Sequence, residues 1–274
     1  MLPVLILTLW VVPWLLVAFN PARADSPGQP YGDLTEISLE DLMSIEVTSV
    51  SKKVERLSEV AAAIYVLTQR DIRRSGVTTI ADALRLVPGL YVGRIDANKW
   101  TVTSRGFSAN FANKLLVLID GRSVYTPLFS GVFWDVQDVL LEDIERIEVI
   151  RGPGASLWGA NAVNGVINII TKKTEDSQGG LARAGGGSEE RGFGSFRYGG
   201  EIGSGASFRV YGKYFDRDHS VDSTGADATD DWDVLRAGFR IDWQLSDRNS
   251  LTFQGDIYDG DAGVMYDFPI LTPP

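Results

Sequence analysis

The stretch IERIEVIRGP, residues 144–153, decides the fold of the first half of this chain. Its β-branched residues predict a buried strand, which ends where the Gly-Pro pair interrupts it. Two further apolar runs, LLVLI at 115–119 and VINIIT at 166–171, predict two more strands, the first of them buried on both faces. These three runs are expected to form the centre of a sheet.

Helices and a tight turn are expected around these strands. A strand at 63–67 leads into a helix that Thr68 caps, and Thr79 caps a second helix over 80–86. The pair Asp120-Gly121 directly follows the run at 115–119 and predicts a hairpin into 123–125. Strands and helices alternate in this way over 59–174, so we expect a compact mixed α/β domain there.

The last third of the chain, 180–274, changes to alternating apolar and polar residues. A period of two predicts strands with one apolar and one polar face. The longest run covers about the length with which a tilted strand crosses an outer membrane. Five segments follow the pattern, three strongly and two weakly: 207–214, 235–245, 251–257, 181–187 and 192–202.

The connections between these segments alternate in length. Residues 203–205 and 246–249 are short, whereas 216–233 is long. Barrels of outer membranes have short turns on the periplasmic side and longer loops outside. A soluble β-sandwich with one wet face shows the same period of two and is the alternative interpretation.

The first 24 residues are interpreted as a signal peptide. Residues 2–19 are almost wholly apolar, and Ala22-Arg23-Ala24 offers a small-x-small site for signal peptidase. The alternative is a membrane anchor, since about 20 apolar residues can span a bilayer as a helix. Nothing basic precedes Arg23, which leaves a start further upstream open. Residues 25–58 are polar and are expected to form a mobile arm.

The composition excludes several classes of function. The chain has 274 residues, a formal net charge of −10, no cysteine and one histidine. It therefore cannot form an HExxH zinc site, a cysteine nucleophile or a disulfide. The acidic balance disfavours nucleic acid as a partner, because phosphates are bound by a basic face. No spacing matches a phosphate loop or a GxSxG elbow, so we do not expect an enzyme.

Several motifs in a fixed order carry a resemblance to one family. They are RGF at 105–107, LVLIDG at 116–121, IERIEVIRGP at 144–153, LWG at 157–159 and GVINIIT at 165–171. Together they resemble the plug-domain signature of the TonB-dependent outer-membrane receptors. The pattern is most similar to the branch that contains the vitamin B12 and colicin I receptors.

The resemblance implies an α+β plug domain over 59–174, followed over 180–274 by antiparallel transmembrane β-barrel strands. Barrels of this family have about 22 strands and a plugged lumen. Five strands cannot close, and open edges in hydrocarbon are costly, so the fold class is an incomplete barrel and we expect a fragment of a longer receptor. The expected location is the Gram-negative outer membrane.

The resemblance also implies that TonB, of the inner-membrane energy-coupling complex, is a partner. The segment Ile45-Glu46-Val47-Thr48-Ser49 is similar to a TonB box, which adds as a strand to TonB. β-Branched residues in a polar arm suit such β-augmentation. An ordinary first strand of the plug is the alternative.

The implied function is energy-coupled uptake of a scarce, large ligand. A ferric siderophore is the first candidate, and cobalamin or another nutrient follows. A truncated ligand-binding plug module without transport is an alternative from another class. A signalling receptor is a further alternative, which would require an extra domain ahead of residue 45.

Two plug loops, at 97–101 and 125–136, are implied to face the ligand. Loops carry binding, and aromatic side chains give a large contact area at a small cost in entropy. Packing of Phe129, Phe133 and Trp134 against the barrel wall is the alternative. The candidate ligand-binding residues are Asn98, Lys99, Trp100, Tyr125, Thr126, Phe129, Phe133 and Trp134.

The long connection at 216–233 is rich in aspartate and holds the only histidine, His219. Carboxylate clusters can bind calcium, and the corresponding loop of the vitamin B12 receptor does so. The spacing matches no EF-hand loop, so a solvated acidic loop is the alternative, and no other cofactor is expected. The candidate calcium ligands are Asp216, Asp218, Asp222, Asp227, Asp230 and Asp231.

Overall fold

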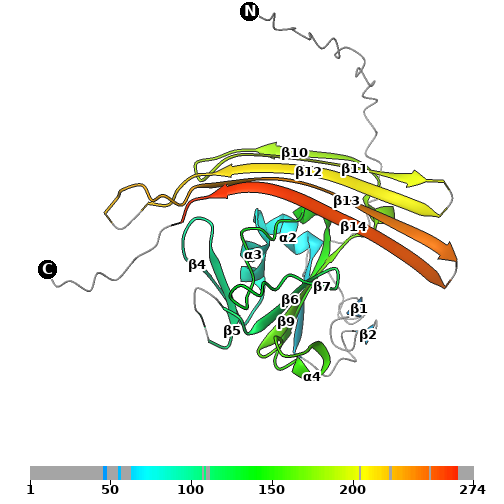
Figure 1. The fold of residues 1–274 in the computed structure, drawn as a ribbon, viewed down its shortest axis with the longest axis horizontal. Coiled ribbons are helices and arrows are strands. Elements are labelled where there is room, and N and C mark those ends of the chain that lie inside the picture. Colours follow the sequence, from blue (N-terminus) through cyan, green and yellow to red (C-terminus); the bar gives the residue numbers. More distant parts are fainter. Residues whose placement is uncertain are drawn as a thin grey trace, which may run out of the picture. The chain divides into compact units, whose positions relative to one another are not determined.

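A mixed five-stranded sheet and an antiparallel five-stranded sheet are the main elements of the chain (Figure 1). The structure, a computed structural model, describes residues 46–47, 55–56, 63–106, 108, 112–203, 205–221, 224–246 and 248–264. The predicted signal peptide, most of the predicted arm and three residues of the predicted TonB box lie outside this part. No helix among the described residues is long and apolar enough to cross a membrane.

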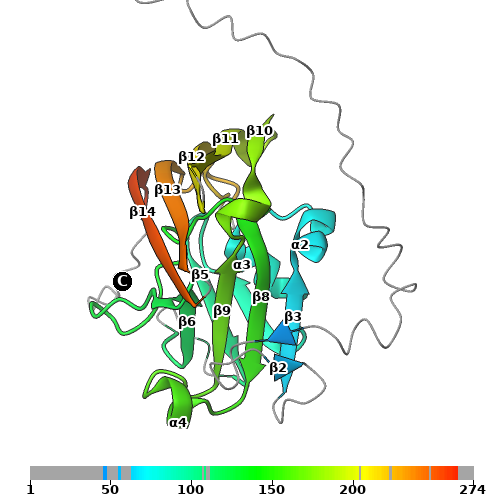
Figure 2. The ribbon, with the colours of Figure 1, turned by 90° about the vertical axis from the view of Figure 1, so that its right-hand side faces the viewer.

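The IERIEVIRGP stretch forms β8 (Ile144–Arg151), an interior strand of the mixed sheet. On one side β8 pairs with β3 (Ile64–Thr68) and on the other with β9 (Gly165–Thr171), both antiparallel. β6 (Leu115–Ile119) pairs parallel with β9, and β7 (Arg122–Ser123) closes the edge. Figure 2 shows β3, β8, β9 and β6 side by side. The three apolar runs are therefore the centre of the sheet, as predicted.

Both predicted helix caps are confirmed. Thr68 forms a capping box at the start of α2 (Gln69–Ser75), and the hydroxyl of Thr79 accepts a hydrogen bond from a backbone amide of α3 (Ile80–Ala83). The hairpin after β6 is also confirmed, since both residues of its turn have positive φ. The other short helices are η2 (Leu84–Leu86), η3 (Leu141–Asp143), α4 (Ala155–Trp158) and η4 (Thr174–Ser177).

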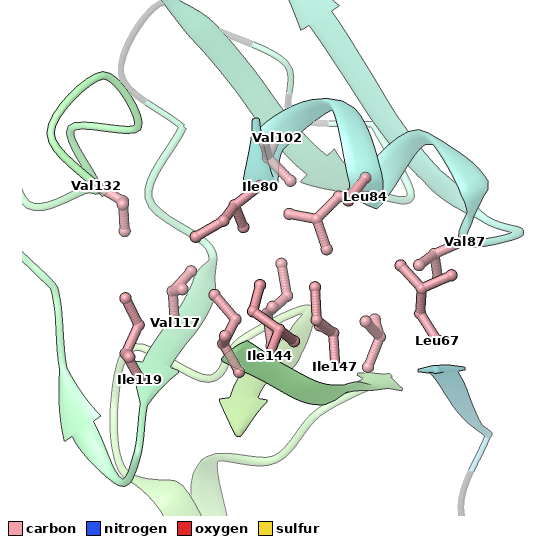
Figure 3. Packing of buried hydrophobic residues seen from close by; sticks show 14 of the residues in the cluster. Leu67, Ile80, Leu84, Val87, Val102, Val117, Ile119, Val132, Ile144 and Ile147 are labelled. Carbon is pink, nitrogen blue, oxygen red and sulfur yellow. The ribbon is translucent and has the colours of Figure 1, made fainter. Parts of the chain in front are cut away.

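The plug core lies between the mixed sheet and the α3–η2 segment. Ile80 and Leu84 face Ile144 and Ile147 of β8, and all four side chains are at most 1% exposed (Figure 3). Burying one such side chain stabilises a fold by roughly 1.5–3 kcal/mol relative to leaving it exposed. The helical segment is therefore held on the sheet by its apolar face.

Two short two-stranded sheets accompany the mixed sheet. β4 (Leu90–Arg94) pairs with β5 (Trp100–Ser104), and β1 (Glu46–Val47) pairs with β2 (Glu55–Arg56), both antiparallel. The predicted loop at 97–101 thus ends inside β5. A backbone hydrogen bond from Ile95 to Lys99 closes the hairpin, so the loop that remains is 95–99.

The second sheet confirms the predicted alternation. Along β12, Arg209 is buried whereas its neighbour Val210 is 40% exposed, and along β14 Ile257 is 75% exposed. Most polar side chains at the covered positions of this sheet meet the mixed domain and most apolar ones point away from it, whereas Phe215, Trp232 and Val234 are buried against it. The predicted fold class, an α+β domain followed by antiparallel strands in a sheet that does not close, is confirmed. The strands are β10 (Gly179–Gly185), β11 (Glu190–Ile202), β12 (Ala206–Arg217), β13 (Trp232–Ser246) and β14 (Asn249–Ala262).

Replacing Gly165→Ala is expected to destabilise the mixed sheet by about 1–3 kcal/mol, as overpacking does. A Cβ at this position would lie 2.2 Å from the backbone oxygen of Ile150, which cannot move without disturbing β8. The matched control is Gly180→Ala in β10, where no atom lies within 4 Å of the added Cβ. Urea unfolding in detergent, followed by tryptophan fluorescence, measures both variants. Equal midpoints for the two would contradict the prediction.

Candidate functional site

The first plug loop, residues 95–99, is tied to the antiparallel sheet through Asn98. This side chain is fully buried, and its amide nitrogen donates to the carbonyl oxygens of Asp230 at 3.1 Å and Gly263 at 2.7 Å. Its amide oxygen contacts the ammonium group of Lys99, which also lies 3.7 Å from a carboxylate oxygen of Asp96. Of the three candidates on this loop, Lys99 is the one with a partly exposed side chain, at 33%.

The third candidate on this segment, Trp100, lies in an aromatic cluster between β5 and the antiparallel sheet. Its ring meets Trp232 of β13 edge to face, with centroids 5.8 Å apart, and Trp232 meets Phe215 in the same way at 4.6 Å. Arg217 stacks over both Phe215 and Trp232. Such pairs contribute about 0.5–1.5 kcal/mol beyond the area they bury. Trp100, a candidate for ligand contact, therefore packs against the sheet and is buried.

The second plug loop forms a compact turn between Thr126 and Gly131, whose backbone groups are bonded at 2.8 Å. Phe129 and Phe133 meet edge to face at 4.6 Å, and Trp134 packs against both the plug core and the aromatic cluster. The tip of the turn is Leu128, which is 80% exposed and was not among the candidates. Pro127 before it and the Ser130-Gly131 pair after it are the sequence signals for a turn at this tip. The candidates Tyr125 and Thr126 are half-buried.

The two loops lie close to each other, since Trp134 packs against the cluster that contains Trp100. Asp135, next to Trp134, lies close enough to Lys99 and Asp96 for their charges to act on it. Burial raises the pKa of Asp135, and the positive charge of Lys99 offsets part of that increase. Ile95, Pro127 and Leu128 are the exposed apolar residues of these loops, and Lys99 and Tyr125 add a partly exposed cation and a partly exposed aromatic ring.

The carboxylates of the acidic connection are bonded to protein groups. Asp216 accepts a hydrogen bond from Arg191 at 2.7 Å, and His219 contacts Asp218 at 2.8 Å and Asp227 at 3.0 Å. Asp231 lies 3.9 Å from Arg191, and Asp230 is buried. Asp222 lies outside the described residues. No group of three or more potential metal ligands occurs within the described ranges, and calcium binding stays a prediction.

The plug is held on the sheet by a row of basic side chains, which we call the basic row. They come from β10, β11, β12 and β13 and all contact the plug segment 136–143. Asp138, Glu142 and Asp143 provide carboxylates, and Val136 provides a carbonyl oxygen. The members of the basic row are Arg183, Arg197, Arg209, Lys213 and Arg236.

Asp143 is the most buried carboxylate of this contact, at 3% exposed. One of its oxygens lies 2.6 Å from the guanidinium group of Arg197, and the other lies 3.3 Å from that of Arg209. Arg209 also donates to the carbonyl oxygen of Lys172 at 3.0 Å. Two cations on one buried carboxylate form a site in which loss of the anion would leave both cations unpaired.

The LVLIDG and GVINIIT motifs meet at a second contact with the sheet. Asp120 accepts hydrogen bonds from the backbone amide and the hydroxyl of Thr171, both at 2.8 Å. Arg240 of β13 donates to the same hydroxyl at 2.9 Å and also bonds Asp242. Asp242 in turn accepts from the backbone amide of Thr174 at 2.8 Å. The end of β9 and the start of η4 are thus fixed to β13.

Of the predicted TonB box, the structure describes Glu46 and Val47. They form β1 and pair with Arg56 and Glu55 respectively, and the side chain of Val47 is buried. Ile45, Thr48 and Ser49 lie outside the described residues. The assignment of this segment to a TonB box stays a prediction, beside the alternative of a first plug strand.

Comparison with known proteins identifies the class. Residues 56–166 match the family model described as TonB-dependent Receptor Plug Domain. The vitamin B12 transporter BtuB of Vibrio vulnificus is 33% identical over 145 residues, which cover 52% of this chain and 23% of that protein. The BtuB of Photobacterium profundum is 27% identical over 225 residues, 80% of this chain and 36% of its own length. The chain thus spans about a quarter to a third of these relatives.

Solved structures show the same fold. The pyoverdine outer membrane receptor FpvA from Pseudomonas aeruginosa aligns with a TM-score of 0.65 and 21% identity, over 79% of this chain and 30% of that one. The siderophore receptor PirA from Acinetobacter baumannii aligns with a TM-score of 0.56 and 24% identity, over 73% and 32%. The fold is that of a plug domain with adjoining barrel strands. Residues 56–166 thus form a plug domain of the TonB-dependent receptor type, and the chain is similar over more of its length to the outer-membrane transporters BtuB. Its relatives are receptors and transporters, in agreement with the prediction that it is not an enzyme.

Replacing Asp143→Asn is expected to destabilise the contact between plug and sheet by about 3–5 kcal/mol, because two buried guanidinium groups lose their anion. The matched control is Glu175→Gln, in a pair with Lys173 whose two side chains are 67% and 66% exposed. An exposed pair of this kind contributes about 0–1 kcal/mol. Urea midpoints of the two variants in detergent provide the measurement, and a D143N midpoint as close to wild type as that of the control would refute the role given to Asp143.

Acidification should reduce the contribution of Asp230 to the free energy of unfolding. Burial alone would raise the pKa of Asp230, but hydrogen bonds from Ser220 and Ala97 outweigh it, so the folded pKa lies below 3.8. A lowered pKa means that the carboxylate stabilises the fold above about pH 4 and loses this effect as the pH falls through the folded value. The unfolding free energies of wild type and Asp230→Asn, compared from neutral pH downward, should converge in acid. A difference that grows on acidification would contradict this.

Proposed function

We propose that this chain forms the plug and the first barrel strands of a receptor that takes up a scarce, large ligand across the outer membrane. The observation that carries the proposal is the difference between the two faces of the antiparallel sheet. One face sets the basic row against the plug, and the other exposes residues such as Phe239 and Ile257. In a barrel wall the apolar face meets the lipid outside and the polar face meets the filled lumen, so both kinds of face are needed. The proposed location is the outer membrane, with residues 1–24 as the export signal.

Energy for uptake is proposed to come through TonB, with residues 45–49 as the TonB box. Support comes from the strand conformation of Glu46–Val47, which already pairs with Glu55–Arg56. A segment that pairs with one strand has the backbone geometry to add to another by β-augmentation. Binding of TonB would then require this short ladder to open.

A ferric siderophore is the first candidate ligand. Lys99 at the first loop and Tyr125 at the second would suit an anionic aromatic chelate, because a cation pairs with its charge and a ring with its aromatic groups. Cobalamin is the second candidate. The observation that favours it is the sequence similarity to vitamin B12 transporters of Vibrio and Photobacterium.

Uptake assays test the function. The complete reading frame is expressed in a Gram-negative host that lacks its own receptors, and radiolabelled ferric enterobactin and cyanocobalamin are offered separately. We expect accumulation of one of them, and a loss of at least about tenfold when a protonophore collapses the proton-motive force. Val47→Pro should keep ligand binding and lose uptake, because proline removes the amide that a β-ladder needs.

The matched control for this variant is Val47→Ile, which keeps the amide and the β-branched side chain and should transport normally. Uptake that persists with the protonophore would overturn energy coupling. Binding of a ligand to outer membranes without accumulation in any variant would favour the binding module. Neither binding nor uptake of either ligand would reject both candidates.

A further inference from the structure

Asp230 is a buried carboxylate at the point where the β12–β13 connection meets the first plug loop. Its side chain is fully buried. One oxygen accepts hydrogen bonds from the backbone amide of Ala97 at 2.8 Å and the hydroxyl of Ser220 at 2.6 Å. The other oxygen accepts from the backbone amide of Ser220 at 2.8 Å. Asp230 therefore joins two segments that are far apart in the sequence.

The backbone of the same residue reinforces this junction. The carbonyl oxygen of Asp230 accepts from the side-chain amide of Asn98, and so does the carbonyl oxygen of Gly263 after β14. Gly263 in turn donates its backbone amide to the carbonyl oxygen of Asp231 at 2.9 Å. Residues 97 and 98 of the plug loop are thus bonded both to the β12–β13 connection and to the residue Gly263 that follows β14.

The junction fixes the one partly exposed cation of the loop. Asn98, held by Asp230 and Gly263, directs its amide oxygen at the ammonium group of Lys99. A carboxylate oxygen of Asp96 lies 3.7 Å from the same ammonium group. Without these contacts Lys99 would sample several rotamers, since a lysine side chain carries up to about 2 kcal/mol of rotamer entropy.

The three donors to the Asp230 carboxylate are two backbone amides and a hydroxyl, all neutral. A carboxylate that accepts hydrogen bonds from three neutral donors holds the donor groups in one arrangement, because each bond has a preferred distance and direction. The oxygen that accepts from both Ala97 and Ser220 would have to give up a donor to serve as a calcium ligand. The contacts therefore assign Asp230 to the junction with the plug.

We propose that Asp230 is a positioning residue for ligand binding, which holds the 95–99 loop so that Lys99 meets an anionic group of the ligand. The proposal rests on the proposed function. It names the chemistry of one contact with the ligand, in which a carboxylate, catecholate or phosphate of the ligand pairs with the ammonium group of Lys99. A cation held in place before binding loses less entropy on binding than a free one. Asp230 itself does not touch the ligand.

The first test is the reactivity of Lys99 towards an acetylating reagent, measured by mass spectrometry on the full receptor in outer membranes. Asp230→Asn should raise the acetylation rate of Lys99 several-fold, because the loop loses its anchor. The rate at Lys173, whose side chain is 66% exposed and far from the junction in sequence, serves as the internal reference and should not change. Asp259→Asn, the same chemical change on β14, is the matched control. An unchanged rate at Lys99 in D230N overturns the proposal, whatever the ligand is.

The second test separates positioning from a general loss of stability. Binding of ferric enterobactin and of cyanocobalamin is titrated in wild type, D230N, Lys99→Gln and the double variant. We expect D230N to weaken binding about tenfold in the wild-type background and to have no further effect when Lys99 is absent, since coupled residues are not additive. Equal weakening in both backgrounds would mean that Asp230 acts through stability alone and would overturn the proposal.

Two further outcomes are distinguishable. If chelation of calcium weakens wild-type binding and has no effect on D230N, Asp230 is a calcium ligand and the positioning role is rejected. If wild type binds neither probe, the proposed ligand classes fail. The acetylation rates still decide in that case whether Asp230 holds the loop.

Discussion

The charge pairing between the basic row and plug segment 136–143 is the constraint on which the arrangement of the two sheets depends. Asp143 shares its two oxygens between Arg197 and Arg209, all three side chains being largely buried. Placing such groups out of water is costly unless each finds its partner, so few other registers of plug on sheet would be tolerated. The contact therefore selects one placement more strongly than an apolar surface would, since apolar contact is not directional.

The same constraint explains why the antiparallel sheet is polar on the face that is covered. In a soluble domain the covered face of a sheet is apolar and the exposed face polar, whereas here Arg209 is covered and Val210 is exposed. The inversion is consistent only if the medium outside is apolar and the filling inside is polar. The apolar side chains of Phe215, Trp232 and Val234 are the exception on the covered side, and they lie at the end where the long connection leaves the sheet.

The sequence predicted the features that depend on neighbouring residues and missed those that depend on residues far apart in the chain. The strands of the mixed sheet, the caps at Thr68 and Thr79 and the alternation of the barrel-type strands follow from local patterns, and the structure confirms them. The burial of Asn98 could not be predicted, because its partners Asp230 and Gly263 stand 132 and 165 residues away in the sequence. A polar residue in an Asp-containing loop gives the same pattern whether it faces solvent or a distant carbonyl group.

An ionic contact of this kind also differs from an apolar one in what its separation costs. When Asp143 and its two arginines part, water can solvate each group, and the loss of the pairing is offset by hydration. When an apolar surface of equal area parts, each Å² exposed costs about 25 cal/mol with nothing to offset it. A plug held by ion pairs therefore has one preferred placement on the sheet, and hydration of the charged groups lowers the free energy needed to separate it. The aromatic cluster around Trp232 lacks that offset, so the end of the plug that carries loops 95–99 and 125–136 should be the end held more firmly to the sheet.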